Sequence, residues 1–80
     1  EAAARAIEGS SSVRSRARVL AAIRESVDGC TDEAGIRVTG MDGSTYRPRR
    51  IELEEAQQIE KSGRKRLTRS GRLAEVYVAR

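Results

Sequence analysis

Six basic residues lie close together near the C-terminal end of the sequence. They are Lys61, Arg64, Lys65, Arg66, Arg69 and Arg72, and residues 61–72 contain no acidic residue. Like charges repel one another, so such a cluster is disfavoured unless it meets a partner of opposite charge. The phosphates of a polyanion are suitable partners, because each one that is neutralised releases counterions. The cluster therefore predicts salt-dependent binding of a polyanion, and the alternative is a solvated polar surface.

A second set of donors lies just upstream, in a segment that favours a helix from Ser44 to about Gln57 or Gln58. It comprises Ser44, Thr45, Arg47, Arg49 and Arg50. An arginine can donate two hydrogen bonds to guanine O6 and N7. Hydroxyl groups and the free N–H groups of a helix start suit phosphate oxygens.

An alternative interpretation pairs these arginines with acids of the same helix, namely Glu52, Glu54 and Glu55. Arg50 is the most open case, because it falls at the edge of the face that should turn to the core. From there its long side chain could instead reach an acid of the preceding helix, such as Glu33.

The charge is unevenly distributed along the chain. Residues 1–43 hold six basic and seven acidic residues, whereas residues 44–80 hold ten basic and five acidic residues. The net charge of +4 therefore arises entirely from the C-terminal half, which carries +5. We expect one end of the molecule to carry the positive field.

The composition excludes several kinds of site. The sequence has no histidine, so neither a histidine base nor a histidine metal ligand is possible. Cys30 is its one cysteine, which rules out an intrachain disulfide and a multi-cysteine zinc site. We interpret Cys30 as an inert residue at a helix junction, and we expect no catalysis, no cofactor and no metal.

The length of 80 residues allows one small domain. No apolar run approaches the roughly 20 residues that span a bilayer, and a lone cysteine fits a reducing, cytoplasmic compartment. The sequence begins at Glu1 rather than Met, which suggests a domain cut from a longer chain. Residues 1–12 are expected to be a linker or N-terminal extension, and residues 13–80 the domain.

Two helices are expected before the one at Ser44. Ser12 can cap a helix from Val13 to about Val27, with Val19, Leu20, Ile23 and Val27 on one apolar stripe. Thr31 can cap a second, short helix that Gly40 ends, with Ala34, Ile36 and Val38 near the core. Asp42 in the following turn is expected to be a turn former or a cap for the third helix. In the third helix, Tyr46 and Leu53 share the core face.

The period of the pattern changes at Ile59 and indicates two strands, over 58–66 and 72–79. If Ile59 and Val78 pair, the turn lies near Thr68-Arg69 and the exposed tip runs from Thr68 to Gly71. The predicted fold class is therefore mostly α with a small β-hairpin.

Residues 17–78 resemble a winged helix-turn-helix domain of the small bacterial or bacteriophage type. The resemblance lies in Thr31-Asp32-Glu33-Ala34, Thr39-Gly40-Met41, Ser44-Thr45-Tyr46-Arg47-Pro48-Arg49-Arg50, Glu52-Leu53, and the stretch from Ser62-Gly63 to Arg72. Related domains usually have a small aliphatic residue at Tyr46 and Gly-Leu at Gln57-Gln58, so we expect the third helix to run further than usual. The resemblance implies a recognition helix in the major groove and a wing on the backbone or minor groove.

These observations predict non-catalytic binding of double-stranded DNA, in transcription, replication or DNA packaging. RNA is less favoured, because Tyr46 and Tyr77 read as core or strand residues rather than as stacking platforms. The alternative is a winged-helix docking module for another protein, which should expose apolar side chains on its wing. A homodimer, or a place within a larger parent protein or complex, is compatible with either function.

Overall fold

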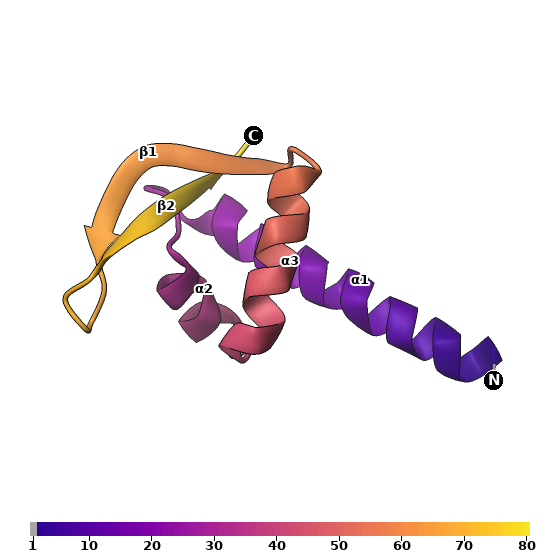
Figure 1. Ribbon diagram of the computed structural model, residues 1–80. Coiled ribbons are helices and arrows are strands. Elements are labelled where there is room, and N and C mark those ends of the chain that lie inside the picture. The colour runs from indigo at the N-terminus through magenta and orange to yellow at the C-terminus, as the bar shows by residue number, and fades with distance from the viewer. Residues whose placement is uncertain (1) are drawn as a thin grey trace.

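The computed structural model describes residues 2–80, and side chains from Ser12 onward. Three helices are followed by two antiparallel strands: α1 (Ala2–Glu25), α2 (Asp32–Thr39), α3 (Gly43–Glu55), β1 (Ile59–Leu67) and β2 (Leu73–Ala79). In Figure 1, α3 crosses α1, α2 lies beside them, and the hairpin projects to the other side from the N-terminus. This layout of helices and hairpin is that of a winged helix, which confirms the predicted fold class.

The core lies where the three helices meet the base of the hairpin. It is built from Val19, Ile23, Cys30, Tyr46, Leu53, Ile59 and Tyr77. The predicted inward positions of Tyr46 and Leu53 are thereby confirmed, and both side chains are almost completely buried. Burying one such large side chain contributes about 1.5–3 kcal/mol, so these few residues supply much of the stability of so small a domain.

Helix α1 differs from the prediction at both ends. It is one continuous helix from Ala2, and does not begin after Ser12. Glycine and serine inside a helix cost only about 1 kcal/mol or less each, so the Gly9–Ser12 run does not have to interrupt it. At the other end α1 stops at Glu25. The prediction that Val27 belongs to the apolar stripe facing the core is therefore wrong, and Val27 is 97% exposed. Gly29, with a φ of 90°, reverses the chain there.

Helix α2 has the predicted caps. The Thr31 hydroxyl accepts a hydrogen bond from the Ala34 N–H at 3.1 Å. Gly40 adopts a left-handed φ of 73° and donates its N–H to the carbonyl of Ile36. Ala34 and Ile36 pack against the core as expected, but Val38 is exposed. Val38 is 69% exposed because it lies in the last turn of this eight-residue helix, beyond the residues that pack against the core.

Helix α3 is shorter than predicted. It ends at Glu55 rather than at Gln57 or Gln58, because Gln57 takes a φ of 60° and turns the chain into β1. The Gln58 N–H then donates back to the carbonyl of Leu53. At the other end Asp42 occupies the cap position, but its side chain makes no capping hydrogen bond.

The hairpin is paired in a different register from the predicted one. Ile59 lies opposite Ala79 and Glu60 opposite Val78, whereas the prediction paired Ile59 with Val78. Between Lys61 and Lys65 the register shifts, and Gly63 there has a φ of 88°. This bulge lets the turn span Thr68 to Arg72, slightly beyond the predicted centre, and the Thr68 N–H donates to the carbonyl of Arg72 at 2.8 Å.

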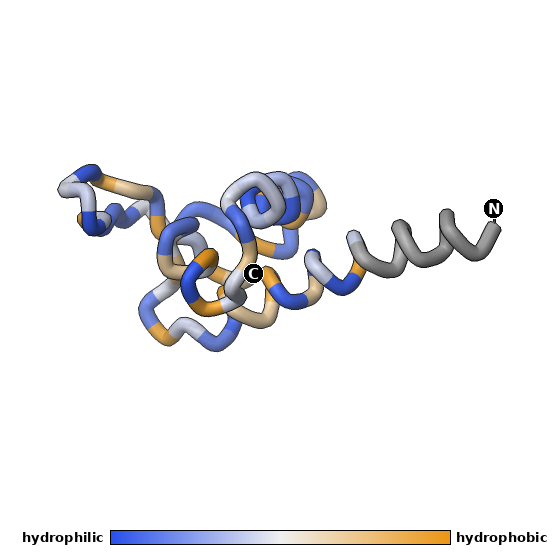
Figure 2. Tube along the Cα trace, turned by 90° about the horizontal axis from the view of Figure 1, so that it is seen from below, coloured by the Kyte–Doolittle hydropathy of each residue, from blue (hydrophilic) through white to orange (hydrophobic). Residues whose placement is uncertain are grey.

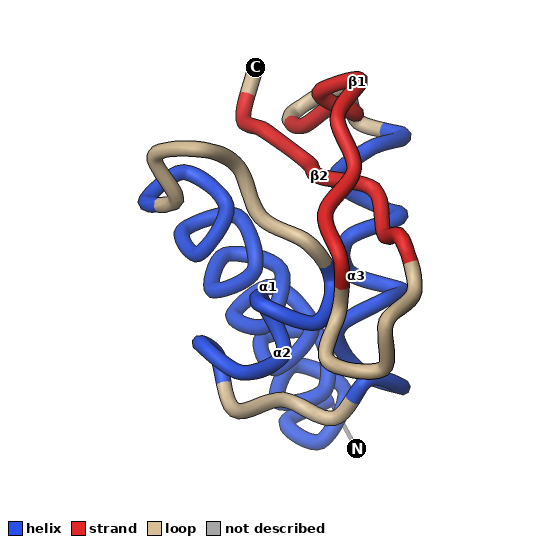
Figure 3. The backbone as a smooth tube through the Cα atoms, turned by 90° about the vertical axis from the view of Figure 1, so that its left-hand side faces the viewer, coloured by secondary structure: helices blue, strands red, loops and turns tan. Residues whose placement is uncertain are grey.

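Two backbone hydrogen bonds join the hairpin to the connection between α1 and α2. The Cys30 N–H donates to the Tyr77 carbonyl at 2.8 Å, and the Tyr77 N–H donates to the Cys30 carbonyl at 2.9 Å. Figure 3 shows both strands on one side of the helices. Cys30, expected at a helix junction, is thus buried in a strand-like bridge. Within residues 2–80, no helix is both long and apolar enough to cross a bilayer.

Replacing Gly35 with alanine tests the contact between α2 and α3. A Cβ at Gly35 would overlap the buried ring and hydroxyl of Tyr46, which cannot move aside. We expect Gly35→Ala to lower the free energy of unfolding by about 2–3 kcal/mol in thermal or denaturant unfolding.

Gly43→Ala is the matched control. There the new Cβ would clash only with the end of the flexible Arg47 side chain and would lie in ordinary van der Waals contact with Ile36, so we expect little loss of stability. Equal stability of the two variants would contradict the packing of Gly35 on Tyr46.

Candidate nucleic-acid interface

The predicted donors of α3 differ in exposure. Ser44, Thr45 and Arg47 are exposed, whereas Arg49 and Arg50 are mostly shielded. The turn at Asp42 starts the helix, since its carbonyl accepts the N–H groups of Thr45 and Tyr46. Ser44 and Thr45 are exposed on this first turn. Arg47 is also exposed, with 57% of its side chain accessible, and its Nε lies 3.8 Å from Asp32 Oδ2. So long an ion pair leaves the Arg47 guanidinium available to another anion.

Arg50 is held inside the protein. Its Nε and Nη2 donate to Asp32 Oδ1 and Oδ2 at 3.0 and 2.7 Å, and its Nη1 donates to Glu54 Oε1 at 3.0 Å. Its guanidinium also stacks 4.5 Å from the centre of the Tyr77 ring. The hydrogen bonds to Asp32 raise the pKa of Arg50, so the group stays charged. The interpretation of Arg50 as an internal ion pair is confirmed, but its partner is Asp32 and not Glu33.

Arg49 is engaged with its own helix. Its Nε and Nη2 donate to the two carboxylate oxygens of Glu52 at 2.9 and 2.8 Å. Arg16 of α1 donates to the same carboxylate at 3.1 Å, so Glu52 joins α1 to α3. The hydrogen bond from Arg49 lowers the pKa of Glu52, which keeps the carboxylate ionised. Arg49 is therefore less available to a ligand than Arg47.

The basic residues of β1 lie on two faces of the hairpin. Arg64 and Arg66 both donate to the carbonyl of Asp28, at 2.9 and 3.3 Å, beside the end of α1. Lys65 instead lies 4.0 Å from Glu75 across the strands. These three residues and Lys61, the fourth basic residue of β1, are all exposed, so the contacts of the three are weak. The predicted basic cluster is thus divided between two surfaces.

The tip of the hairpin is attached to α2. The backbone N–H of Arg69 donates to the Glu33 carboxylate, with Oε2 at 3.2 Å. Glu33 also forms an ion pair with Arg37. The predicted exposure of the tip is confirmed for Arg69, Ser70 and Gly71, while Thr68 is half-buried. This attachment leaves the side chain of Arg69 at the surface.

A groove of about 390 Å³ separates the hairpin tip from the helices. It is lined by Glu33, Ile36, Arg47, Thr68, Ser70, Arg72, Leu73 and Ala74. Arg47 comes from α3 and Arg72 from the hairpin, so tertiary folding brings these two predicted residues to one site. Arg64 and Arg66 are not part of it.

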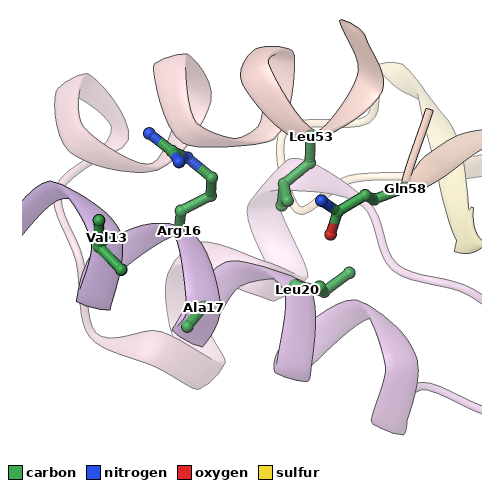
Figure 4. A pocket seen from close by; sticks show the side chains of 6 residues that line it. All are labelled: Val13, Arg16, Ala17, Leu20, Leu53 and Gln58. Atoms are coloured by element: carbon green, nitrogen blue, oxygen red, sulfur yellow. The ribbon is translucent and has the colours of Figure 1, made fainter. Parts of the chain in front are cut away.

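A second cavity, of about 190 Å³, lies between α1 and the end of α3 (Figure 4). Its lining is mainly aliphatic, from Val13, Ala17, Leu20 and Leu53, with Arg16 and Gln58 at its edges. Arg16 is already bound to Glu52. This cavity therefore offers shape and apolar surface but no free charged group for chemistry.

Nowhere in residues 2–80 do three or more histidine, cysteine, aspartate or glutamate side chains gather as they would around a metal ion. Burial raises the pKa of both Tyr46 and Tyr77, so neither phenol ionises readily. In comparisons with family models, curated proteins and solved structures, nothing matches this chain.

Sequence reasoning missed three contributors to this region. Asp32 was not singled out as a partner of Arg50, and Glu33 was considered only for that role, yet Asp32 holds Arg50 and Glu33 holds the hairpin tip. Leu73 was read as an ordinary strand residue but lines the groove. A pair of adjacent acids followed by basic segments was the available signal, but it does not identify which cation pairs with which acid.

Asp32→Asn tests the ion pair that holds Arg50. The variant would leave the guanidinium, only 14% exposed, without its main counter-charge. We expect a loss of about 2 kcal/mol or more in the free energy of unfolding.

Asp42→Asn is the control, because it makes the same change at an exposed residue that has no side-chain capping bond. Its stability should stay within about 0.5 kcal/mol of wild type. An Asp32→Asn variant as stable as Asp42→Asn would show that the pair does not support the fold.

Proposed function

We propose that this chain is a non-catalytic double-stranded DNA-binding domain. In this proposal the first turns of α3 enter the major groove, and the hairpin acts as a wing on the adjacent backbone. One observation carries it: Arg47 of α3 and Arg72 of the hairpin line one groove, together with the hydroxyl residues Thr68 and Ser70. The groove also contains the Glu33 carboxylate, which is engaged by Arg37 and the Arg69 N–H. Its two guanidinium groups and hydroxyl donors suit phosphates and base edges.

The charge distribution supports a polyanionic partner. Residues 44–80, which form α3 and the hairpin, carry +5, and the remaining half is slightly acidic. Arg64, Lys65 and Arg66 add exposed positive charge along the wing. Such a field increases the local concentration of nucleic acid and speeds its association.

The proposed DNA-binding surface includes fewer residues than the sequence alone indicated. Ser44, Thr45, Arg47, Arg69 and Arg72 form its centre, and the basic residues of β1 form its flank. Arg49 and Arg50 are left out, because their donors are used by Glu52, Asp32 and Glu54. Arg47 is therefore the one arginine of the helix proposed to read a base.

Duplex DNA is a better partner than a single strand. Single-strand binding generally relies on exposed aromatic rings that stack on bases. The aromatic residues of this chain, Tyr46 and Tyr77, are both buried. The setting we propose is the cytoplasm of a bacterial cell, with a role in transcription, replication or phage DNA packaging, alone, as a homodimer or within a larger protein.

A protein-docking module is the second candidate. Leu67 and Leu73 on the wing are each 66% exposed, which is the kind of surface a docking wing would present. The basic surroundings of these residues favour DNA, and the salt dependence of binding separates the two candidates.

We expect duplex DNA to bind with an affinity that falls steeply as salt rises, and more tightly than a single strand of the same sequence. Replacing Arg47 and Arg72 with alanine should weaken binding and reduce the magnitude of the salt slope by up to about two. Fluorescence anisotropy over a salt series measures both quantities.

The double variant Arg14→Ala/Arg24→Ala is a control of equal charge, since both residues are exposed on α1. Its salt slope should stay close to that of the wild type. A flat salt response of the wild type would refute DNA binding, and equal losses in the two double variants would mean that only net charge matters.

A further inference from the structure

Two large aliphatic side chains are exposed to solvent on the hairpin, the most basic part of the molecule. Leu67 and Leu73 face each other directly across the strands, as the last pair before the turn. Each is 66% exposed. Figure 2 shows hydrophobic segments interrupting the otherwise hydrophilic end of the projecting hairpin. The pair is therefore an apolar patch at a defined place in the wing.

The fold does not need this pair. The hydrophobic core is formed at the other end of the hairpin, through Ile59 and Tyr77. Polar residues at positions 67 and 73 would leave that core and the Cys30–Tyr77 bridge intact. Strands in small proteins usually place charged residues at such exposed positions, which discourages association of sheet edges. The two leucines thus call for a ligand with an apolar surface.

The surroundings of the pair indicate what that ligand is. Arg72 precedes Leu73 and lines the same groove, and Arg69 lies in the turn between the two leucines. Arg66, next to Leu67 in β1, points to the other face and donates to the carbonyl of Asp28. An apolar protein surface would rarely be matched by two neighbouring guanidinium groups. A DNA base step is matched, because it is apolar on its stacked faces and bordered by phosphates on both strands. Leu73 also lines the groove that contains Arg47, so the pair can approach a duplex already held by α3.

We propose that Leu67 and Leu73 form a wedge that inserts at a base step in the minor groove of the bound duplex and kinks it. This inference rests on the proposed DNA binding. Apolar side chains inserted from the minor groove unstack a base step and bend the duplex toward the major groove. The energy of unstacking is lowest at flexible pyrimidine–purine steps and at mismatches. The wedge therefore adds a preference for deformable DNA to whatever Arg47 reads directly.

The test uses the full chain and three duplexes: a regular one, one with a central mismatch, and one with 2-aminopurine at a TA step. Bending is measured by energy transfer between labelled ends, and unstacking by 2-aminopurine fluorescence. We expect wild type to bend the duplex, to raise the fluorescence, and to bind the mismatch on the order of tenfold more tightly than the regular duplex.

The key variant is Leu67→Ser/Leu73→Ser. It should keep the salt slope of the wild type but lose the bending, the fluorescence increase and the preference for the mismatch. Val27→Ser/Val38→Ser removes two aliphatic side chains that are at least as exposed as the leucines and lie outside the wing, and should behave as wild type. Leu67→Met/Leu73→Met should restore the bending. If thermal unfolding shows that the serine variant is unfolded, Leu67→Ala/Leu73→Ala takes its place.

Each contrary outcome has a separate meaning. Salt-dependent binding of a straight duplex by wild type would overturn the wedge and leave the DNA-binding proposal in place. Unchanged bending by the leucine variants would also overturn it. Absence of salt-dependent binding by wild type would refute the proposed function itself, and the exposed leucines would then favour a protein partner.

Discussion

The ion pair between Arg50 and Asp32 is the interaction on which the arrangement of this domain depends. Arg50 belongs to α3 and Asp32 to α2, and the same guanidinium contacts Tyr77 of β2. Three elements that are separated in the sequence are thus held by one charged group. A pair this shielded is costly to break, because each partner would remain desolvated without a counter-charge. The angle between the helix proposed to read DNA and the wing is set at this point.

Burial divides the arginines of the C-terminal half into two kinds. Arg50 and Arg49 are mostly shielded and use their donors on acids, so they support the fold. Arg47 and Arg72 are exposed and line a common groove. On α3 the difference follows from position: Arg49 and Arg50 lie three and four residues after Tyr46, near its inward side, whereas Arg47 follows it directly and faces solvent. One helix thereby supplies structural arginines and, in the proposed function, a binding arginine as well.

The hairpin is attached at two places, and these attachments create the groove. Its base is joined to Cys30 by paired backbone hydrogen bonds, and its tip is joined to Glu33 through the N–H of Arg69. The bulge at Gly63 bends the strands between these two points. A wing fixed in this way can present Arg72 and Leu73 at a constant distance from Arg47, which reduces the entropy lost when a rigid ligand such as duplex DNA binds.

The features that depend on neighbouring residues could be predicted from the order of the amino acids. The cap at Thr31, the stop at Gly40, the inward faces of Tyr46 and Leu53, and the hairpin after Ile59 all follow from local hydrogen bonding and periodicity. The tertiary structure decided the partner of Arg50, the register beyond Gly63 and the meeting of Arg47 with Arg72. It also decided that Val27 lies outside the core. These four features depend on how segments far apart in the chain approach one another. In the sequence, several acids are possible partners for one arginine, and one pattern of apolar residues is compatible with several strand registers. Only the packed geometry selects among them, because ion pairing and strand pairing act over a few ångströms in space and not along the sequence.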